Sequence, residues 1–270
     1  MATSIIDPGA AADALVRSVR CKPLAAASMT LRLRENSLRT ANALASSERR
    51  QSDGGYRTAT AEDPPLAMLI AAETIEAAVL FADMRGYTGL AEQLPPAQVV
   101  SILDEFFTML TRVTANFGGQ VFHIAGDGMM AGFGIGDSRG LGARAALAAS
   151  RAMLQSFAPL GARWRDEFAV VTGIGIGLHS GDVALGFLGP PGKQAITMIG
   201  DTANVAARLC SRAHAGEVLY SCAVAAALRT DADGVGVGAK AFLQLPQFEL
   251  RGRSELLDIW CVPAPERLAH

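Results

Sequence analysis

The sequence predicts an α+β fold in which helices pack on a mostly antiparallel sheet. Two patterns indicate this class. Short apolar runs typical of strands occur in pairs, and single stretches with helical periodicity interrupt them. The chain has 270 residues, of which 50% are hydrophobic. That length and composition are sufficient for one good-sized folded domain with an extension.

The first half of the predicted domain alternates strands and helices. The short apolar segment Thr74–Ala82 predicts a strand. After Pro95-Pro96, apolar residues recur on one face and predict a long helix that ends at Gly118-Gly119. Gln120–Phe133 predicts two strands joined by a tight glycine turn. The alanine-rich segment Leu141–Phe157 predicts a second helix.

The second half is richer in strands. The predicted strands are Val170–Leu178, Val183–Leu188, Ala195–Ile199 and Leu257–Val262. Thr202–Ala213 predicts a helix between the third and fourth of them. Glycines alternate from Gly173 to Gly177, so we expect another element to pack closely against this strand.

Residues 1–65 differ from this pattern. Between Arg17 and Arg57 there are nine basic and three acidic residues, a balance of +6 that leaves −8 for the rest of a chain whose total is −2. We predict a basic, largely irregular N-terminal extension and linker over residues 1–65; a short helix that pairs with a partner is the alternative. The folded domain would span residues 66–265, and residues 266–270 would form a tail.

Composition narrows the class of protein. A net charge of −2 gives no overall bias towards nucleic acid. The four cysteines are scattered without metal-ligand spacing and predict reduced thiols. We find no apolar run near the roughly 20 residues that span a bilayer, and Asp7 and Pro8 do not fit a signal peptide. The sequence therefore predicts a cytoplasmic protein with no membrane segment.

Two aspartates and one helix face carry the candidate chemistry. Asp83 follows an apolar run, and Asp127 lies on the glycine turn of the predicted hairpin. If the two strands are neighbours, their carboxylates can hold metal ions between them. Asn204 and Arg208 are four residues apart and project from one helical face, where arginine suits a phosphate group. Each feature alone is common at solvated surfaces, whereas together they indicate a metal- and phosphate-binding site.

Four segments and a late tripeptide carry a family resemblance. They are Leu80–Thr88, Gly118–Ala131, His179–Gly189, Ile199–Leu209 and Leu250-Arg251-Gly252. In this order and spacing, over roughly residues 75–262, the chain resembles the catalytic domain of class III adenylyl and guanylyl cyclases. The resemblance implies a ferredoxin-like or palm-like, mostly antiparallel sheet with helices packed on it, as in the dimeric cyclase homology domain.

The resemblance also implies a metal and phosphate site. Residues matching Asp83 and Asp127, with the backbone of Met84, would bind two Mg²⁺ or Mn²⁺ ions per active site. The turn Gly86-Tyr87-Thr88 would bind phosphate oxygens through its amides. Arg251 is a looser match to a basic residue that contacts the terminal phosphates.

The implied reaction is that of a phosphorus–oxygen lyase. The ribose 3′-oxygen of ATP attacks the α-phosphorus, which forms cyclic 3′,5′-AMP and releases pyrophosphate. Asn204 would orient the ribose, and Arg208 would stabilise the charge that develops in the transition state. In the family the aspartates come from one domain and the Asn/Arg pair from another, so the implied partner is a second copy in a homodimer.

His123 and Thr197 match the two base-selecting positions. Thr197 fits a variant found in adenylyl cyclases, but His123 stands where these usually have lysine. A neutral imidazole can donate to adenine N1 or accept from guanine N1–H, so His123 leaves GTP open. ATP is favoured because Thr197 fits the adenylyl cyclase variant.

Three alternatives to an adenylyl cyclase remain open on the sequence. They are a guanylyl cyclase, a cyclase-like nucleotide-binding regulatory domain with weak or no turnover, and a two-metal enzyme with a polymerase-like or diguanylate-type palm. The pair Asn204 and Arg208 argues against the palm enzyme, which needs no such pair. The presence of Asp83, Asp127, Asn204 and Arg208 together argues against the regulatory domain, because a decayed site rarely keeps both metal ligands and the arginine.

Overall fold

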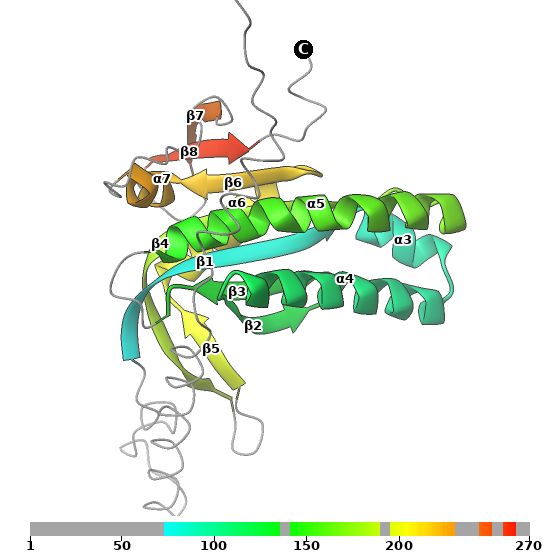
Figure 1. Cartoon of the computed structure of the whole chain (residues 1–270), viewed down its shortest axis with the longest axis horizontal. Coiled ribbons are helices and arrows are strands. Elements are labelled where there is room, and N and C mark those ends of the chain that lie inside the picture. Colours follow the sequence, from blue (N-terminus) through cyan, green and yellow to red (C-terminus); the bar gives the residue numbers. More distant parts are fainter. Residues whose placement is uncertain (1–72, 136–140, 190–194, 230–242, 250–255, 263–270) are drawn as a thin grey trace, which may run out of the picture.

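The computed structural model of the protein describes residues 73–135, 141–189, 195–229, 243–249 and 256–262 (Figure 1). The strands are β1 (Glu73–Arg85), β2 (Gln120–Ala125), β3 (Gly128–Phe133), β4 (Gly173–Leu188), β5 (Ala195–Ile199), β6 (Glu217–Ser221), β7 (Leu243–Glu249) and β8 (Leu256–Val262). The helices are α3 (Tyr87–Gln93), α4 (Pro96–Asn116), α5 (Gly142–Phe168), α6 (Asp201–Arg212) and α7 (Cys222–Arg229). The predicted N-terminal extension (residues 1–65) and C-terminal tail (residues 266–270) lie outside the described residues.

The strands form one sheet in the order β2-β3-β1-β4-β6-β8-β7, and β5 pairs with the second half of β4. Among the described strands, β4 and β6 run parallel, and the other pairs are antiparallel. The predicted α+β class with a mostly antiparallel sheet is confirmed. No helix in the described part of the chain has both the length and the apolar character needed to cross a membrane.

Strands β1 and β4 are longer than the sequence pattern predicts. They pair without interruption from Glu73 opposite Leu185 to Arg85 opposite Gly173. The two strands predicted at Val170–Leu178 and Val183–Leu188 are therefore one strand, because β1 supplies backbone partners across the polar residues between them. For the same reason β1 continues past Ala82, so Asp83 lies inside a strand rather than at its end.

The long helix α4 is confirmed, and its apolar stripe, which includes Phe106 and Leu110, is buried. Helix α5 extends 11 residues beyond the predicted end at Phe157, and Trp164 in this added part is buried. The sequence pattern did not reveal α3, β6, α7 and β7. Strand β6 is buried at all five positions, and such short apolar runs have no diagnostic periodicity.

The two faces of the sheet have different partners. Along β1, Leu80 and Met84 belong to the main core with α4, α5 and α7, whereas Val79 faces a second core that α6 also lines. In Figure 1, α4 and α5 lie side by side across one face of the sheet. Because successive strand residues alternate in direction, Asp83 and Arg85 lie on the same face as α6.

The predicted close approach to the glycine-rich strand is confirmed. A Cβ atom at Gly177 would lie 2.1 Å from the backbone nitrogen of Cys210 and 2.3 Å from the carbonyl oxygen of Ala206. Both atoms belong to α6. The missing side chain therefore allows the backbone of α6 to lie directly on β4.

Candidate functional site

Two carboxylates come together where β1 meets the β2–β3 hairpin. Asp83 pairs with Gly128 on one side and with Gly175 on the other. Asp127 occupies the two-residue turn between β2 and β3, and its carbonyl oxygen accepts a hydrogen bond from the amide of Met84 at 3.1 Å. This bond fixes the turn against β1, so the two predicted aspartates lie beside each other.

The electrostatics of Asp83 reflect this arrangement. Partial burial, and next the negative charge of Asp127, raise the pKa of Asp83 above its ordinary value, while the nearby Arg85 opposes the rise. Two neighbouring carboxylates repel each other, and a cation between them removes that repulsion. The pair thus has the charge expected of a cation site.

The donor set fits a hard divalent cation. Carboxylate oxygens are the ligands that Mg²⁺ and Mn²⁺ prefer, and Mg²⁺ is commonly held by one or two carboxylates together with substrate phosphates. The described residues contain no group of three or more His, Cys, Asp or Glu side chains suited to a metal. Asp83 and Asp127 would therefore need further oxygen ligands from the backbone or from a bound phosphate.

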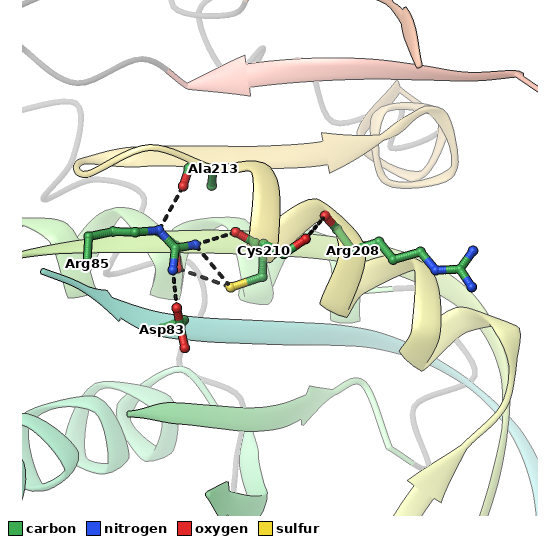
Figure 2. Close-up of polar contacts among 7 residues, drawn as sticks. Asp83, Arg85, Arg208, Cys210 and Ala213 are labelled. Atoms are coloured by element: carbon green, nitrogen blue, oxygen red, sulfur yellow. Dashed lines mark hydrogen bonds and ion pairs between the residues drawn. The ribbon is translucent and has the colours of Figure 1, made fainter. Parts of the chain in front are cut away.

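Arg85 is the residue at this site to which the sequence assigned no role (Figure 2). Its guanidinium forms an ion pair with Asp83 and donates to the carbonyl oxygens of Cys210 and, at 2.9 Å, of Ala213. Strand alternation offered a signal, because residues two apart in a strand point to the same face. An acid and a base at that spacing, next to a glycine-rich strand, predict such a pair.

Asn204 and Arg208 both lie on α6, as predicted. Asn204 is exposed and Arg208 is partly buried, whereas the neighbouring Val205 and Leu209 are fully buried. The two candidate residues therefore share the outer side of the helix. In Figure 2 the side chain of Arg208 extends away from Asp83.

The base-selecting candidates lie on two strands that approach each other. His123 is exposed on β2 opposite Met130, next to an irregularity in the pairing, and Thr197 is partly buried on β5 opposite Gly186. Their chain neighbours Phe122 and Met198 belong to the same apolar cluster, and a Cβ at position 132 would touch both. His123 and Thr197 thus flank one apolar cluster.

The predicted phosphate turn is the start of a helix. Gly86 precedes α3 with φ +84°, a conformation that favours glycine, and a Cβ there would lie 2.5 Å from the carbonyl oxygen of Val171. Tyr87 and Thr88 are the first two residues of α3, where backbone amides lack helical partners and can bind an anion. Arg251 lies outside the described residues.

Comparison with known proteins identifies the family. The sequence profile of the adenylate and guanylate cyclase catalytic domain matches residues 70–260, which is more than half of the chain. The chain belongs to this family. The resemblance to class III cyclases is therefore confirmed.

Relatives of this cyclase domain are longer proteins. An adenylate cyclase of Anabaena cylindrica is 31% identical over 147 residues, which cover 52% of this chain and 28% of the relative. Adenylate cyclase 1 of Rhizobium meliloti is 30% identical over 191 residues, which cover 68% of this chain and 27% of the relative. The cyclase domain thus matches little more than a quarter of the length of these curated relatives.

Solved structures share the fold. The adenylyl cyclase CyaB from P. aeruginosa has a TM-score of 0.64 at 24% identity, covering 73% of this chain and 98% of that one. The guanylyl cyclase Cya2 has a TM-score of 0.62 at 23% identity, covering 72% and 94%. At these identities the likeness establishes the fold of the cyclase domain and leaves its base preference open.

Proposed function

We propose that this cyclase domain converts ATP to cyclic 3′,5′-AMP and pyrophosphate at sites formed between two copies of the chain. The observation that carries the proposal is the pair of adjacent carboxylates, Asp83 and Asp127, in a chain of the cyclase family. Asp83 lies inside β1, and Asp127 lies on a tight turn that is hydrogen-bonded to β1, which suits a reaction that depends on positioning.

In this proposal Asp83, Asp127 and the backbone of Met84 hold two Mg²⁺ or Mn²⁺ ions. When bound, the ions lower the pKa of the ribose 3′-hydroxyl and neutralise charge on the phosphates. The amides that open α3, at Gly86, Tyr87 and Thr88, bind phosphate oxygens, with Arg251 as a further candidate. The two carboxylates alone provide too few ligands, which is consistent with a site that is completed by the nucleotide.

Asn204 and Arg208 act on the sugar and on the developing charge. The amide of Asn204 orients the ribose so that its 3′-oxygen faces the α-phosphorus. The guanidinium of Arg208 donates to the oxygens on which charge grows as the bond to pyrophosphate breaks. Both side chains lie on the outer side of α6, where a nucleotide can reach them.

In a homodimer, the two aspartates of one chain can meet Asn204 and Arg208 of the other chain. Asn204 lies nine residues before Ala213, which Arg85 contacts, so about 13 Å of helix separates Asn204 from the Asp83 end of α6. The side chain of Arg208 is also directed away from Asp83, which supports the proposal that a second chain supplies this half of the site. A two-fold pair of chains then contains two complete sites.

Complementation tests this proposal. Purified protein with Mn²⁺ and ATP should form cyclic AMP, and Asp83→Ala and Arg208→Ala should each reduce the rate at least about a hundredfold. Mixing these two variants should restore roughly a quarter of the wild-type rate, because half of the random dimers contain one intact site. Failure of the mixture to exceed either variant would exclude a shared site. Absence of any cyclic nucleotide over a wide protein concentration range would exclude the enzyme.

The choice of base rests on His123 and Thr197. ATP is our proposal because Thr197 fits an adenylyl cyclase position, and GTP is the second candidate because His123 replaces the usual lysine. If His123 contacts the base, His123→Lys should raise turnover with ATP, or its ratio to turnover with GTP, by a few-fold, since lysine donates to adenine N1. Unchanged rates with both nucleotides would remove His123 from the base pocket.

A regulatory domain that binds nucleotide without turnover is the other alternative to the enzyme. The assay for cyclic product distinguishes the two. We also propose a cytoplasmic location, where ATP is available.

A further inference from the structure

Arg85 connects two parts of the cyclase domain that have different proposed tasks. On one side its guanidinium pairs with Asp83, whose side chain is 33% exposed. On the other side it donates to the carbonyl oxygens of Cys210 and Ala213 at the C-terminal end of α6 (Figure 2). Arg85 itself is 23% exposed, so all of these bonds are partly shielded from water.

The contacts with α6 suit a cation. The carbonyl oxygen of Cys210 already accepts a hydrogen bond from the amide of Ala213 at 3.1 Å, but the last carbonyl groups of a helix carry partial negative charge and can accept a further donor. The planar guanidinium can donate to several acceptors at once, which the single ammonium of a lysine cannot do with the same geometry. Ala213 follows α6 directly, so Arg85 closes the end of this helix.

The neighbouring strand is shaped around Arg85. A Cβ atom at Gly175 would lie 2.4 to 2.7 Å from atoms of the guanidinium, so glycine at this position leaves the space that Arg85 occupies. The thiol of Cys210 donates to the carbonyl oxygen of Gly175 at 3.3 Å. Glycine, cysteine and arginine thus hold the end of α6, the strand β4 and Asp83 together.

We propose that Arg85 is a positioning residue with two separable contacts: it balances the charge of Asp83 before metal binds, and it holds the C-terminal turn of α6 on β4. The effect of these contacts on catalysis rests on the proposed function. Because α6 also carries Asn204 and Arg208, Arg85 links the metal half of one site to the helix that serves the other site of the homodimer.

A measurement of metal affinity tests whether the ion pair between Arg85 and Asp83 does more than support the structure. A paired guanidinium competes with a dication for a carboxylate oxygen of Asp83 and repels the dication. We therefore expect Arg85→Met to bind Mn²⁺ about fivefold more tightly than wild type at pH 8, measured by calorimetry or by the loss of the free Mn²⁺ resonance signal. A residue with a merely structural role would weaken metal binding or leave it unchanged.

Hydrogen exchange measures the second contact. In Arg85→Met the amides of the last turn of α6, up to Ala213, should exchange about tenfold faster, because their turn loses its hydrogen bonds to the guanidinium. Arg85→Lys keeps a charge near Asp83 but cannot reach both carbonyl groups. It should therefore show wild-type Mn²⁺ affinity, within about twofold, together with the faster exchange.

Two controls keep the outcome decisive. Arg112→Met removes an exposed arginine of α4 and should alter neither readout. Exchange within α4 reports on global folding, and Arg85→Lys carries the test if Arg85→Met does not fold. Wild-type exchange in α6 of the folded variants, or Mn²⁺ binding in Arg85→Met that is unchanged or weaker, would overturn the proposal. Neither readout needs turnover, so a lack of cyclic nucleotide would defeat the proposed function separately.

Discussion

The two faces of the sheet differ in the size of their cores and in how closely their helices approach the strands. The face under α4 and α5 buries large side chains, among them Trp164, Phe106, Phe133 and Tyr220. The core under α6 contains fewer buried residues, among them Phe122 and Met198, and there Ala203, Ala206, Gly175 and Gly177 allow α6 to lie close to the sheet. The charged pair of Asp83 and Arg85 lies on this second face.

Because of this difference, one face supplies most of the folding free energy and the other face carries the candidate site. Full burial of a large apolar side chain contributes about 1.5–3 kcal/mol, so the face with the large side chains supplies most of the folding free energy. The α6 face can then hold a carboxylate whose pKa is raised by burial, which is unfavourable for folding at neutral pH. Substitutions on the two faces should therefore have different consequences.

The largest effect on stability is expected on the face with the large side chains. Phe106 is fully buried in α4, and its ring meets that of Phe157 edge to face at 6.0 Å. Phe106→Ala should lower the free energy of unfolding by about 3–5 kcal/mol, measured by urea denaturation, because the cavity cannot close. Val100→Ala, on the exposed side of the same helix, should change it by less than about 0.5 kcal/mol. Similar losses in both variants would contradict the assignment of stability to this face.

An intermediate effect is expected where α6 contacts β4. Gly177→Ala places a Cβ atom against the backbone of α6, which must move because no flexible side chain can yield. We expect a loss of about 1–3 kcal/mol in unfolding free energy together with lower turnover. Gly89→Ala is the matched control, since it is helical and its nearest neighbour would be the side chain of Gln93 at 3.9 Å. That control should be neutral or slightly stabilising. A tolerated Gly177→Ala would mean that α6 does not need its close approach.

The sequence predicts the face with the large side chains better than the α6 face. The apolar stripe of α4 has a period that no strand can match, so α4 was predicted to within a residue or two of its ends. The two glycines of the hairpin and the apolar runs beside them fixed β2 and β3 in the same way. These signals are local, so they predict a helix or strand even when the element that packs against it is unknown.

What the sequence missed depends on contacts between distant segments. The uninterrupted pairing of β1 with Gly173–Leu185 of β4 includes polar residues of both strands, and no apolar pattern in the sequence marks these residues. The contacts of Arg85 with Cys210 and Ala213 join positions more than 120 residues apart. The alternating glycines did predict a close neighbour for β4, but they could not identify it as α6.

The smallest effect tests the cost of charge on the α6 face. The folded protein holds the proton of Asp83 more tightly than the unfolded chain does, because its pKa is raised. Above that pKa the ionised carboxylate lowers stability, and as the pH falls through it the cost disappears. Without metal, Asp83→Asn should therefore have an equal or slightly higher Tm than wild type at pH 7, with the difference shrinking towards pH 4. Arg85 keeps its bonds to Cys210 and Ala213 in this variant.

Metal should reverse the order of the two proteins. Mn²⁺ at 100 times its dissociation constant should stabilise the wild type by about 2.7 kcal/mol, since it binds the folded state. It should stabilise Asp83→Asn much less, because a neutral amide is a poorer ligand than a carboxylate. Asp104→Asn, an exposed site on α4, should respond to Mn²⁺ like wild type. If Asp83→Asn were less stable than wild type at pH 7 without metal, the carboxylate would support the fold, and the separation of stability from chemistry between the two faces would fail.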